Sequence, residues 1–200
     1  MEFAIIDYGA SNMFSLIASF KRVNIQIKVV SEKVRLGKYS AIILPGVGNF
    51  ASAVQRMSEL KNEILDAIAK GTFIFGICLG MQLLFNESEE GEGEGLGILE
   101  GKVVKFPRTV KVPHMGWNLV EPKGYSVLLS NYDYERWAYF AHSYYPKPAD
   151  NNNVKGITYY GIEFTSVVEE KNIFGTQFHP EKSGKFGRHI IRNFVEYVRR

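Results

Sequence analysis

Residues 72–85 contain the feature that most restricts how this chain can fold. The apolar, β-branched and aromatic run at 72–77 predicts a buried strand, and residues 79–85 carry apolar side chains at helical spacing. Cys78 stands at the junction, with Gly76 and Gly80 two residues away on either side. These glycines allow a sharp turn from strand to helix, which is the geometry of a nucleophile elbow. We therefore expect the Cys78 side chain to project at the carboxyl end of a strand.

Cys78 is the chain's only cysteine, and it allows two interpretations. At a helix N-terminus, the unpaired amides and the helix dipole favour a thiolate, which would make Cys78 a nucleophile. A single cysteine is otherwise often a small buried hydrophobe. Because one cysteine excludes an internal disulfide, we expect a reducing compartment, the cytoplasm.

The overall composition favours one globular α/β domain over residues 1–200. The chain has 200 residues, 46% of them hydrophobic and 22% charged, which suffices for one well-buried core. The net charge is only +3, and the basic residues form no run or aromatic-interleaved stripe, which argues against a nucleic-acid partner. We also expect no signal peptide and no membrane span, because no window approaches about 20 apolar residues.

The first half of the chain alternates between strand and helix patterns. Strands are predicted at 3–6, 25–30, 41–44 and 72–77. Helices are predicted from a cap at Ser11 or Asn12 to Arg22, at 51–57, and at 60–70 with Gly71 as the C-cap. Short continuous apolar strands of this kind predict an open, mostly parallel sheet covered by helices on both faces.

The second half has a different character. Residues 86–95 are polar, acidic and glycine-rich and predict a loop. Runs at 102–106, 117–120, 137–141 and 157–160 predict antiparallel strands appended to the parallel sheet, and 146–153 predicts an exposed turn. A final buried strand is expected at 173–178 and an amphipathic helix at 187–199.

A base for Cys78 is available directly after the last predicted strand. His179 would lie at that strand's carboxyl end, which is the edge where open α/β sheets place their sites. Pro180 disfavours helix, and alternate residues of an extended segment point the same way, so Glu181 could reach the imidazole. The sequence therefore predicts a triad of Cys78, His179 and Glu181.

The other three histidines have less specific surroundings. His189 falls within the last predicted helix and is expected to be structural. His114 and His142 sit in predicted loops beside aromatic residues, where they could either line a pocket or make ordinary hydrogen bonds.

Attack on a carbonyl would require donors for the developing oxyanion. The amide of Leu79 is one candidate, and the glycine-rich segment 45–48 after the third strand offers others. Gly46-x-Gly48-x-x-Ala51 also fits a dinucleotide fingerprint, but it follows the third strand rather than the first and no acidic residue closes the next strand. A metal site built on Cys78 and His179 is a further alternative, although no pair of residues has zinc-ligand spacing.

Two segments carry a resemblance to a known family. Residues 76–82 (Gly-Ile-Cys-Leu-Gly-Met-Gln) and 177–181 (Gln-Phe-His-Pro-Glu) resemble the two signatures of class I glutamine amidotransferases. Segments 6–12, 45–50, 113–118 and 179–183 resemble the glutaminase subunits of imidazole glycerol phosphate synthase, over essentially the whole chain. The resemblance implies that family's flavodoxin-like fold. The chain departs from the usual pattern at Ala10-Ser11.

The resemblance also implies roles for individual residues. Cys78 would attack the side-chain carboxamide of glutamine, with His179 as acid and base and Glu181 orienting it. Gly46 and Val47 would form the oxyanion strand with Leu79. Gln82, Glu90 and the backbone of His142, Ser143 and Tyr144 would hold the substrate.

The same resemblance implies a partner. Such glutaminases deliver ammonia to a (β/α)₈ cyclase subunit in a heterodimer for histidine biosynthesis, without a cofactor, and Trp117, Tyr139 and Lys182 match interface positions. Three alternatives stay open: an amidotransferase for anthranilate, guanylate or pyridoxal phosphate synthesis, a non-catalytic partner subunit, and a generic cysteine hydrolase.

Overall fold

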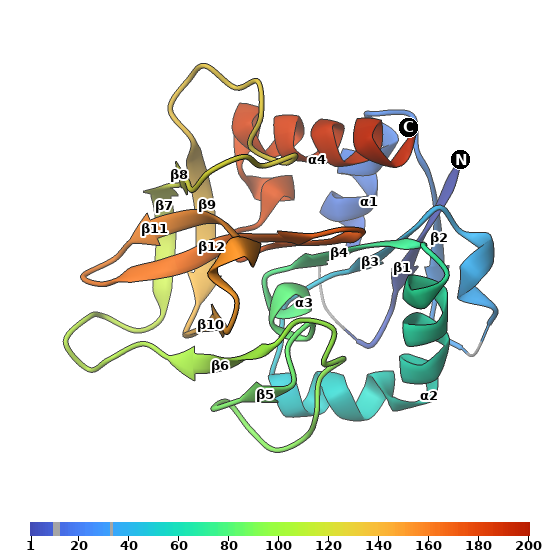
Figure 1. Cartoon of the computed structure of the whole chain (residues 1–200), viewed down its shortest axis with the longest axis horizontal. Coiled ribbons are helices and arrows are strands. Elements are labelled where there is room, and N and C mark those ends of the chain that lie inside the picture. The colour runs from blue at the N-terminus through green and yellow to red at the C-terminus, as the bar shows by residue number, and fades with distance from the viewer. Residues whose placement is uncertain (10–12, 33) are drawn as a thin grey trace.

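The computed structural model describes residues 1–9, 13–32 and 34–200, and its centre is a mixed sheet. The described residues place its strands in the order β2-β1-β3-β4-β13-β12-β11-β8 (Figure 1). Neighbours from β2 to β13 are parallel, and those from β13 to β8 are antiparallel. The strands span β2 Gln26–Val30, β1 Glu2–Ile6, β3 Ala41–Leu44, β4 Phe73–Ile77, β13 Ile173–Thr176, β12 Glu163–Glu170, β11 Val154–Tyr159 and β8 Glu121–Pro122.

Helices cover both faces of this sheet, as the strand patterns predicted (Figure 1). Side chains alternate along β1, so that Phe3 packs with α1 (Met13–Lys21) and α4 (Gly184–Val198). Ala4 belongs to the opposite core, with α2 (Phe50–Ala69) and α3 (Leu79–Gln82). The predicted α/β class, with an open, mostly parallel sheet, is therefore confirmed.

Helix α2 is one continuous helix rather than the two segments expected from the sequence. The side chain of Asn49 caps it by accepting from the amide of Ser52, 3.2 Å away. Gly71, with φ of +96°, follows the last helical turn and its amide donates to Ile68, as in a Schellman motif. The predicted stop is correct. The cap expected at Ser11 or Asn12 of the first helix lies outside the described residues.

The structure corrects several expectations for residues 86–170. Two small sheets stand apart from the central one: β10-β6-β5 and the antiparallel pair β7-β9. The predicted turn at 146–153 is wrong in its first half, because Pro146 to Pro148 pair with β6. Strand β12 also went unpredicted. The bounds are β5 Glu87–Ser88, β6 Gly101–Lys105, β7 His114–Leu119, β9 Trp137–His142, β10 Tyr144–Pro148, with 3₁₀ turns at Leu36–Lys38, Asn151–Asn153 and Pro180–Lys182.

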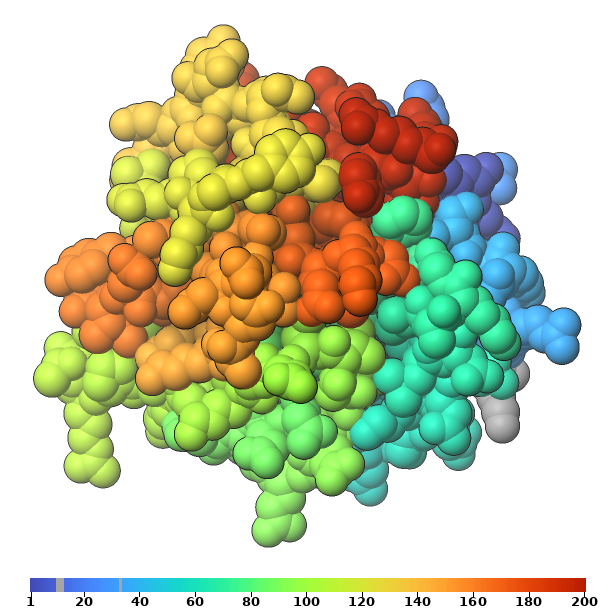
Figure 2. All heavy atoms as spheres, viewed as in Figure 1, coloured from blue at the N-terminus to red at the C-terminus, as the bar shows by residue number. Residues whose placement is uncertain are grey.

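Helix α4 places the C-terminal residues beside the N-terminal part of the chain. Arg199 donates to the carbonyl oxygen of Val23 at 3.4 Å, and Figure 2 shows red C-terminal atoms against blue N-terminal ones. Within the described residues, no helix combines the length and apolar character needed to cross a bilayer.

Candidate active site

The turn between β4 and α3 places Cys78 in a strained conformation. Its φ of 52° and ψ of −107° lie outside the regions that L-residues favour, as expected of a nucleophile elbow. Tight packing holds this turn, because a Cβ on Gly46 would lie 2.0 Å from the carbonyl oxygen of Ile77. A Cβ on Gly80 would meet the carbonyl oxygen of Leu44 equally closely. The chain at the end of β3 therefore packs directly against the end of β4 and the start of α3, with no room for a side chain at Gly46 or Gly80.

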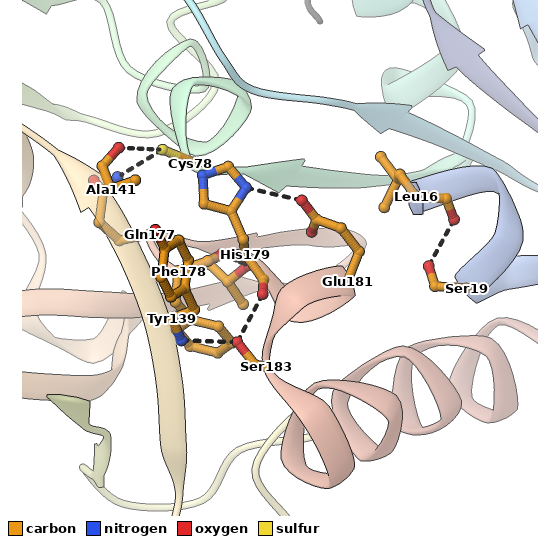
Figure 3. Close-up of polar contacts among 11 residues, drawn as sticks. Leu16, Ser19, Cys78, Tyr139, Ala141, Gln177, Phe178, His179, Glu181 and Ser183 are labelled. Atoms are coloured by element: carbon orange, nitrogen blue, oxygen red, sulfur yellow. Dashed lines mark hydrogen bonds and ion pairs between the residues drawn. The ribbon is translucent and has the colours of Figure 1, made fainter. Parts of the chain in front are cut away.

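Strand pairing brings the second half of the site to the first. Strand β13 is the parallel neighbour of β4, and the amide of Cys78 donates to the carbonyl oxygen of Thr176 at 2.7 Å. His179 follows β13 by three residues and is 2% exposed. Its imidazole lies beside the Cys78 sulfur, with Glu181 on the far side (Figure 3). The structure thus brings together the three residues predicted as a triad.

The contact between His179 and Glu181 is short, with Nδ1 and Oε1 2.9 Å apart. The backbone conformation that produces this contact differs from the extended one predicted. Residues Pro180–Lys182 form a 3₁₀ turn, so the prediction that an extended segment aims both side chains the same way is wrong. Pro180 fits the first position of that turn, where no backbone donor is needed. The turn folds the carboxylate back onto the ring.

The charges around His179 favour its protonated form. Burial on its own would lower the pKa of His179, but the negative charge on Cys78 and hydrogen bonds to Cys78 and Glu181 raise it to about 10. An imidazolium beside a thiolate is the state in which a cysteine nucleophile and its proton donor are both ready.

A cavity of about 290 Å³ opens beside the Cys78 sulfur. This size is at the small end for small-molecule sites and suits a ligand of amino-acid size. The predicted oxyanion and substrate residues all line it: Gly46, Val47, Leu79, Gln82, Glu90, His142, Ser143 and Tyr144. These eight residues, which come from four separate segments of the chain, therefore surround one cavity beside Cys78.

Gln82 is buried, and its side-chain NH₂ group is hydrogen-bonded within the protein while its side-chain oxygen is left for a ligand. Its side-chain nitrogen donates to the Tyr144 carbonyl at 2.9 Å and to Gln177 Oε1 at 3.2 Å. The Tyr144 carbonyl also accepts from His142 Nδ1 at 2.7 Å, so both of its acceptor positions are filled. Tyr144 therefore holds Gln82 in place, and the Gln82 carbonyl oxygen is the atom of this group that can accept from a ligand.

Glu90 connects the cavity to the start of α2. Its Oε2 accepts from the amide of Phe50 at 2.8 Å, at the positive end of the helix dipole. Burial raises the pKa of Glu90, and the bond from Phe50 opposes that effect. A carboxylate has about four acceptor positions, so this bond leaves room for a ligand ammonium. The acidic loop at 86–95 therefore supplies a carboxylate that can bind a cation in the cavity.

The remaining histidines are structural in their contacts. His189 Nε2 lies 2.8 Å from the Ser130 carbonyl, as predicted for a structural residue. His114 and His142 pair at 3.2 Å inside an aromatic cluster, and only His142 also lines the cavity. Burial lowers the pKa of His114 to about 4 and that of His142 to about 3. Both rings are neutral near pH 7.

Trp117, Tyr139 and Lys182 gather on one surface. Trp117 and Tyr139 are cross-strand partners in β7 and β9, with ring centroids 6.1 Å apart. The Lys182 ammonium lies 5.7 Å from the centre of the Tyr139 ring, and Trp117 is 54% exposed. Tyr139 also accepts a backbone bond from His179, so this surface adjoins the base.

The structure bears separately on the two alternatives for this region, a dinucleotide-binding segment and a metal site. Gly46 of the dinucleotide-like segment packs against the backbone of Ile77 and Leu79, which accounts for its glycine. Within the described residues, no three His, Cys, Asp or Glu side chains gather in a way that would hold a metal ion.

Two residues with no role assigned from the sequence complete the arrangement. Gln177 donates to the Cys78 sulfur at 3.5 Å. Ser183 donates to the His179 carbonyl at 2.6 Å and accepts from the Tyr139 amide at 2.9 Å. Both stand within four residues of His179, and this proximity was the available signal.

Comparisons with known proteins agree with this geometry. Residues 4–198 match the family model described as glutamine amidotransferase class-I. The chain is 47% identical over 197 residues to the imidazole glycerol phosphate synthase subunit HisH of Methanocaldococcus jannaschii, covering 97% of this chain and 98% of that one. It is 44% identical over 197 residues to the HisH subunit of Methanothermobacter thermautotrophicus, covering 98% of each. Among solved structures, PurLQS of Thermotoga maritima superimposes with a TM-score of 0.80 at 20% identity, covering 98% of each chain.

Proposed function

The chain belongs to the class I glutamine amidotransferases and is a glutaminase subunit of imidazole glycerol phosphate synthase, and we propose how its residues perform that activity. The proposal rests above all on one observation: the His179 imidazole stands between the Cys78 sulfur and the Glu181 carboxylate (Figure 3). We take residues 1–200 as one domain.

The first half-reaction forms a thioester. The Cys78 thiolate attacks the side-chain carboxamide carbon of glutamine, and the electron pair of the C=O bond moves to oxygen. Amides of Leu79 and of the segment around Gly46 and Val47 stabilise that oxyanion, each worth roughly 3 kcal/mol. His179 gives its proton to the leaving nitrogen, the C–N bond breaks, and ammonia departs.

The second half-reaction releases glutamate. His179, now neutral, takes a proton from water, and the hydroxide attacks the thioester carbon. The C–S bond breaks and Cys78 returns as the thiolate beside an imidazolium. Glu181 holds the ring in one orientation during both steps.

The substrate's α-carbon groups bind away from the sulfur. The carbonyl oxygen of Gln82 accepts from a substrate N–H, because both Gln82 amide hydrogens are used within the protein. Glu90 attracts the α-ammonium. The backbone of His142, Ser143 and Tyr144 forms the cavity wall that faces it.

Ammonia then passes to a cyclase partner, a (β/α)₈ barrel that makes imidazole glycerol phosphate and aminoimidazole-carboxamide ribonucleotide in the cytoplasm. Free ammonia is mostly protonated near neutral pH and is then no nucleophile, so a closed route is required. The surface of Trp117, Tyr139 and Lys182 is the proposed contact, because it adjoins the base.

One assay separates this proposal from its alternatives. Glutamine hydrolysis is measured for the chain alone, with its cyclase subunit, and with the cyclase plus the cyclase's ribonucleotide substrate. We expect low activity alone, strong stimulation in the full mixture, and none for Cys78→Ala. Equal rates with and without cyclase would indicate a generic hydrolase, and no activity under any condition would indicate a non-catalytic subunit.

A further inference from the structure

Gln177 is a buried residue beside the nucleophile, and the reaction scheme leaves it unused. It follows β13, is 0% exposed, and its own amide donates to the Ser166 carbonyl at 2.9 Å. Its side chain reaches across to the turn between β4 and α3, where Nε2 lies 3.5 Å from the Cys78 sulfur (Figure 3). A fully buried carboxamide aimed at a reactive sulfur requires a reason beyond packing, because burying an amide is costly unless its partners are suitable.

The direction of this carboxamide is fixed by a neighbouring chain of bonds. The Tyr144 carbonyl can only accept, so Gln82 must turn its NH₂ group towards it. The same NH₂ group then faces Gln177, which must present its oxygen. Gln177 is left with its NH₂ group towards the sulfur. The order Tyr144, Gln82, Gln177, Cys78 therefore has one consistent set of donors.

Two groups of opposite kind flank the sulfur, the Ala141 carbonyl oxygen and the Gln177 NH₂ group. As a thiol, it donates to the Ala141 carbonyl 3.9 Å away. As a thiolate it can only accept, and the Ala141 oxygen then repels it. Gln177 offers the donor that the thiolate needs, in addition to the imidazolium of His179.

We propose that Gln177 is a positioning residue that favours the thiolate of Cys78 and fixes its direction, and that Gln82 sets the orientation of Gln177. This inference rests on the proposed function, because it gives Cys78 the role of nucleophile. It also links the two ends of the site, since Gln82 contacts the substrate while its amide group orders the donor to the sulfur. If the Gln177 side chain lost this orientation, Cys78 would become a weaker nucleophile although Cys78 itself is unchanged.

The test is the pH dependence of Cys78 alkylation by iodoacetamide, measured by mass spectrometry on the assembled complex with the cyclase subunit. Gln177→Met keeps the length and removes the donor, so the alkylation midpoint should rise by about one to two pH units. Gln177→Glu adds a negative charge and should raise it further. Gln55→Met, at an exposed position on α2, is the matched control and should leave the midpoint unchanged.

A second variant keeps the test decisive if Gln177 variants fold poorly. Gln82→Leu leaves Gln177 in place but releases its orientation, so the midpoint should rise by a smaller amount. An unchanged midpoint in folded Gln177→Met, or in Gln82→Leu, would overturn the proposal. Failure of the proposed function would look different: the wild-type complex would hydrolyse no glutamine, or would hydrolyse it equally without the cyclase, whatever the alkylation midpoints.

Discussion

The amide of His179 donates to the carbonyl oxygen of Tyr139 at 2.9 Å, which ties the base to strand β9 by its main chain. Ser183 adds a second tie, because its hydroxyl bridges the His179 carbonyl and the Tyr139 amide. The position of the imidazole is therefore set from the strand that also carries the exposed aromatic surface. Bonds to the backbone of His179 therefore hold the base in place in addition to the bond between its ring and Glu181.

Ser183→Ala should reduce glutaminase kcat in the complex by about 10- to 100-fold, because a base displaced by a fraction of an ångström loses alignment. Stability should fall by about 1–2 kcal/mol from the two lost bonds. Steady-state kinetics and urea unfolding measure these effects. Ser130→Ala, which removes a bond to the Val127 carbonyl far from the cavity, should leave kcat unchanged. Equal kcat for both variants would show that the tie is not needed.

Glu181→Gln should lower the pKa of His179, which NMR titration measures. It should also reduce kcat by about two to four orders of magnitude. The pKa of His179 is raised in the folded protein to about 10 from 6.5. Its stabilising contribution is thus complete below pH 6.5 and is lost as the pH rises through 10. The variant should lose about 1.5–3 kcal/mol at pH 6 and less at pH 10. The exposed Glu196→Gln provides the control, and a deficit that grows with pH would contradict the assignment.

Glu90→Gln should raise KM for glutamine by about 10- to 100-fold, with a smaller change in kcat. The reason is that a charged contact to the substrate ammonium, worth roughly 1.5–3 kcal/mol, becomes a neutral one. Initial rates over a range of glutamine concentrations measure the effect. Glu92→Gln, an exposed residue of the same loop, should behave as wild type. A fall in kcat with unchanged KM would place Glu90 elsewhere in the reaction.

Gly46→Ala should abolish most activity, because the new methyl group would overlap the Ile77 carbonyl and the Leu79 amide. We expect a loss of at least about 100-fold in kcat/KM, since an oxyanion donor moves, and a stability loss of about 1–3 kcal/mol. Gly37→Ala is the control, because no atom lies within 4 Å of its added Cβ. Glutaminase assays and thermal unfolding test the pair. Normal activity of Gly46→Ala would mean that the elbow tolerates a wider spacing.

Acid should destabilise the protein through the buried histidine pair. The folded pKa of His142 is about 3, so between pH 6.5 and 3 the unfolded chain binds a proton that the folded chain excludes. Stability therefore falls as the pH falls, by about 1.4 kcal/mol per pH unit for this group. His142→Asn retains a donor to the Tyr144 carbonyl without titrating, so its stability should decline less steeply below pH 6.5. Urea unfolding at several pH values measures the free energy of unfolding of both proteins. If that free energy fell equally steeply with pH in wild type and in His142→Asn, the prediction would be refuted.

Much of the site could be predicted because its chemistry is encoded in short segments. The spacing of Gly76, Cys78 and Gly80 predicts the elbow from residue types alone. The pair His179 and Glu181 predicts the base in the same way. The contact between His179 and Glu181 was expected for the wrong local reason, since Pro180 begins a 3₁₀ turn rather than an extended segment. A proline fits either conformation, and only the tertiary contacts decide.

Other features depend on partners distant in sequence. Residues 146–148 look like a turn from composition, yet they are a strand because β6 lies alongside to pair with them. Gln177 stands two residues from His179, but residue type and spacing predicted no role for it, because the orientation of its side chain depends on Gln82 and Tyr144. Strand assignment and amide orientation in such cases are set by non-local hydrogen bonds, which no local pattern records.

Strands β4 and β13 are about 100 residues apart in the chain but share one ladder of backbone bonds, ending at the Cys78 amide and the Thr176 carbonyl. The backbones that carry the two reacting groups are consequently held about one strand spacing apart, roughly 4.8 Å, and the bonds of His179 and Ser183 to β9 then fix the imidazole. Surface loops between these strands can therefore differ in length without changing that separation, as long as β9 keeps its bonds to His179 and Ser183.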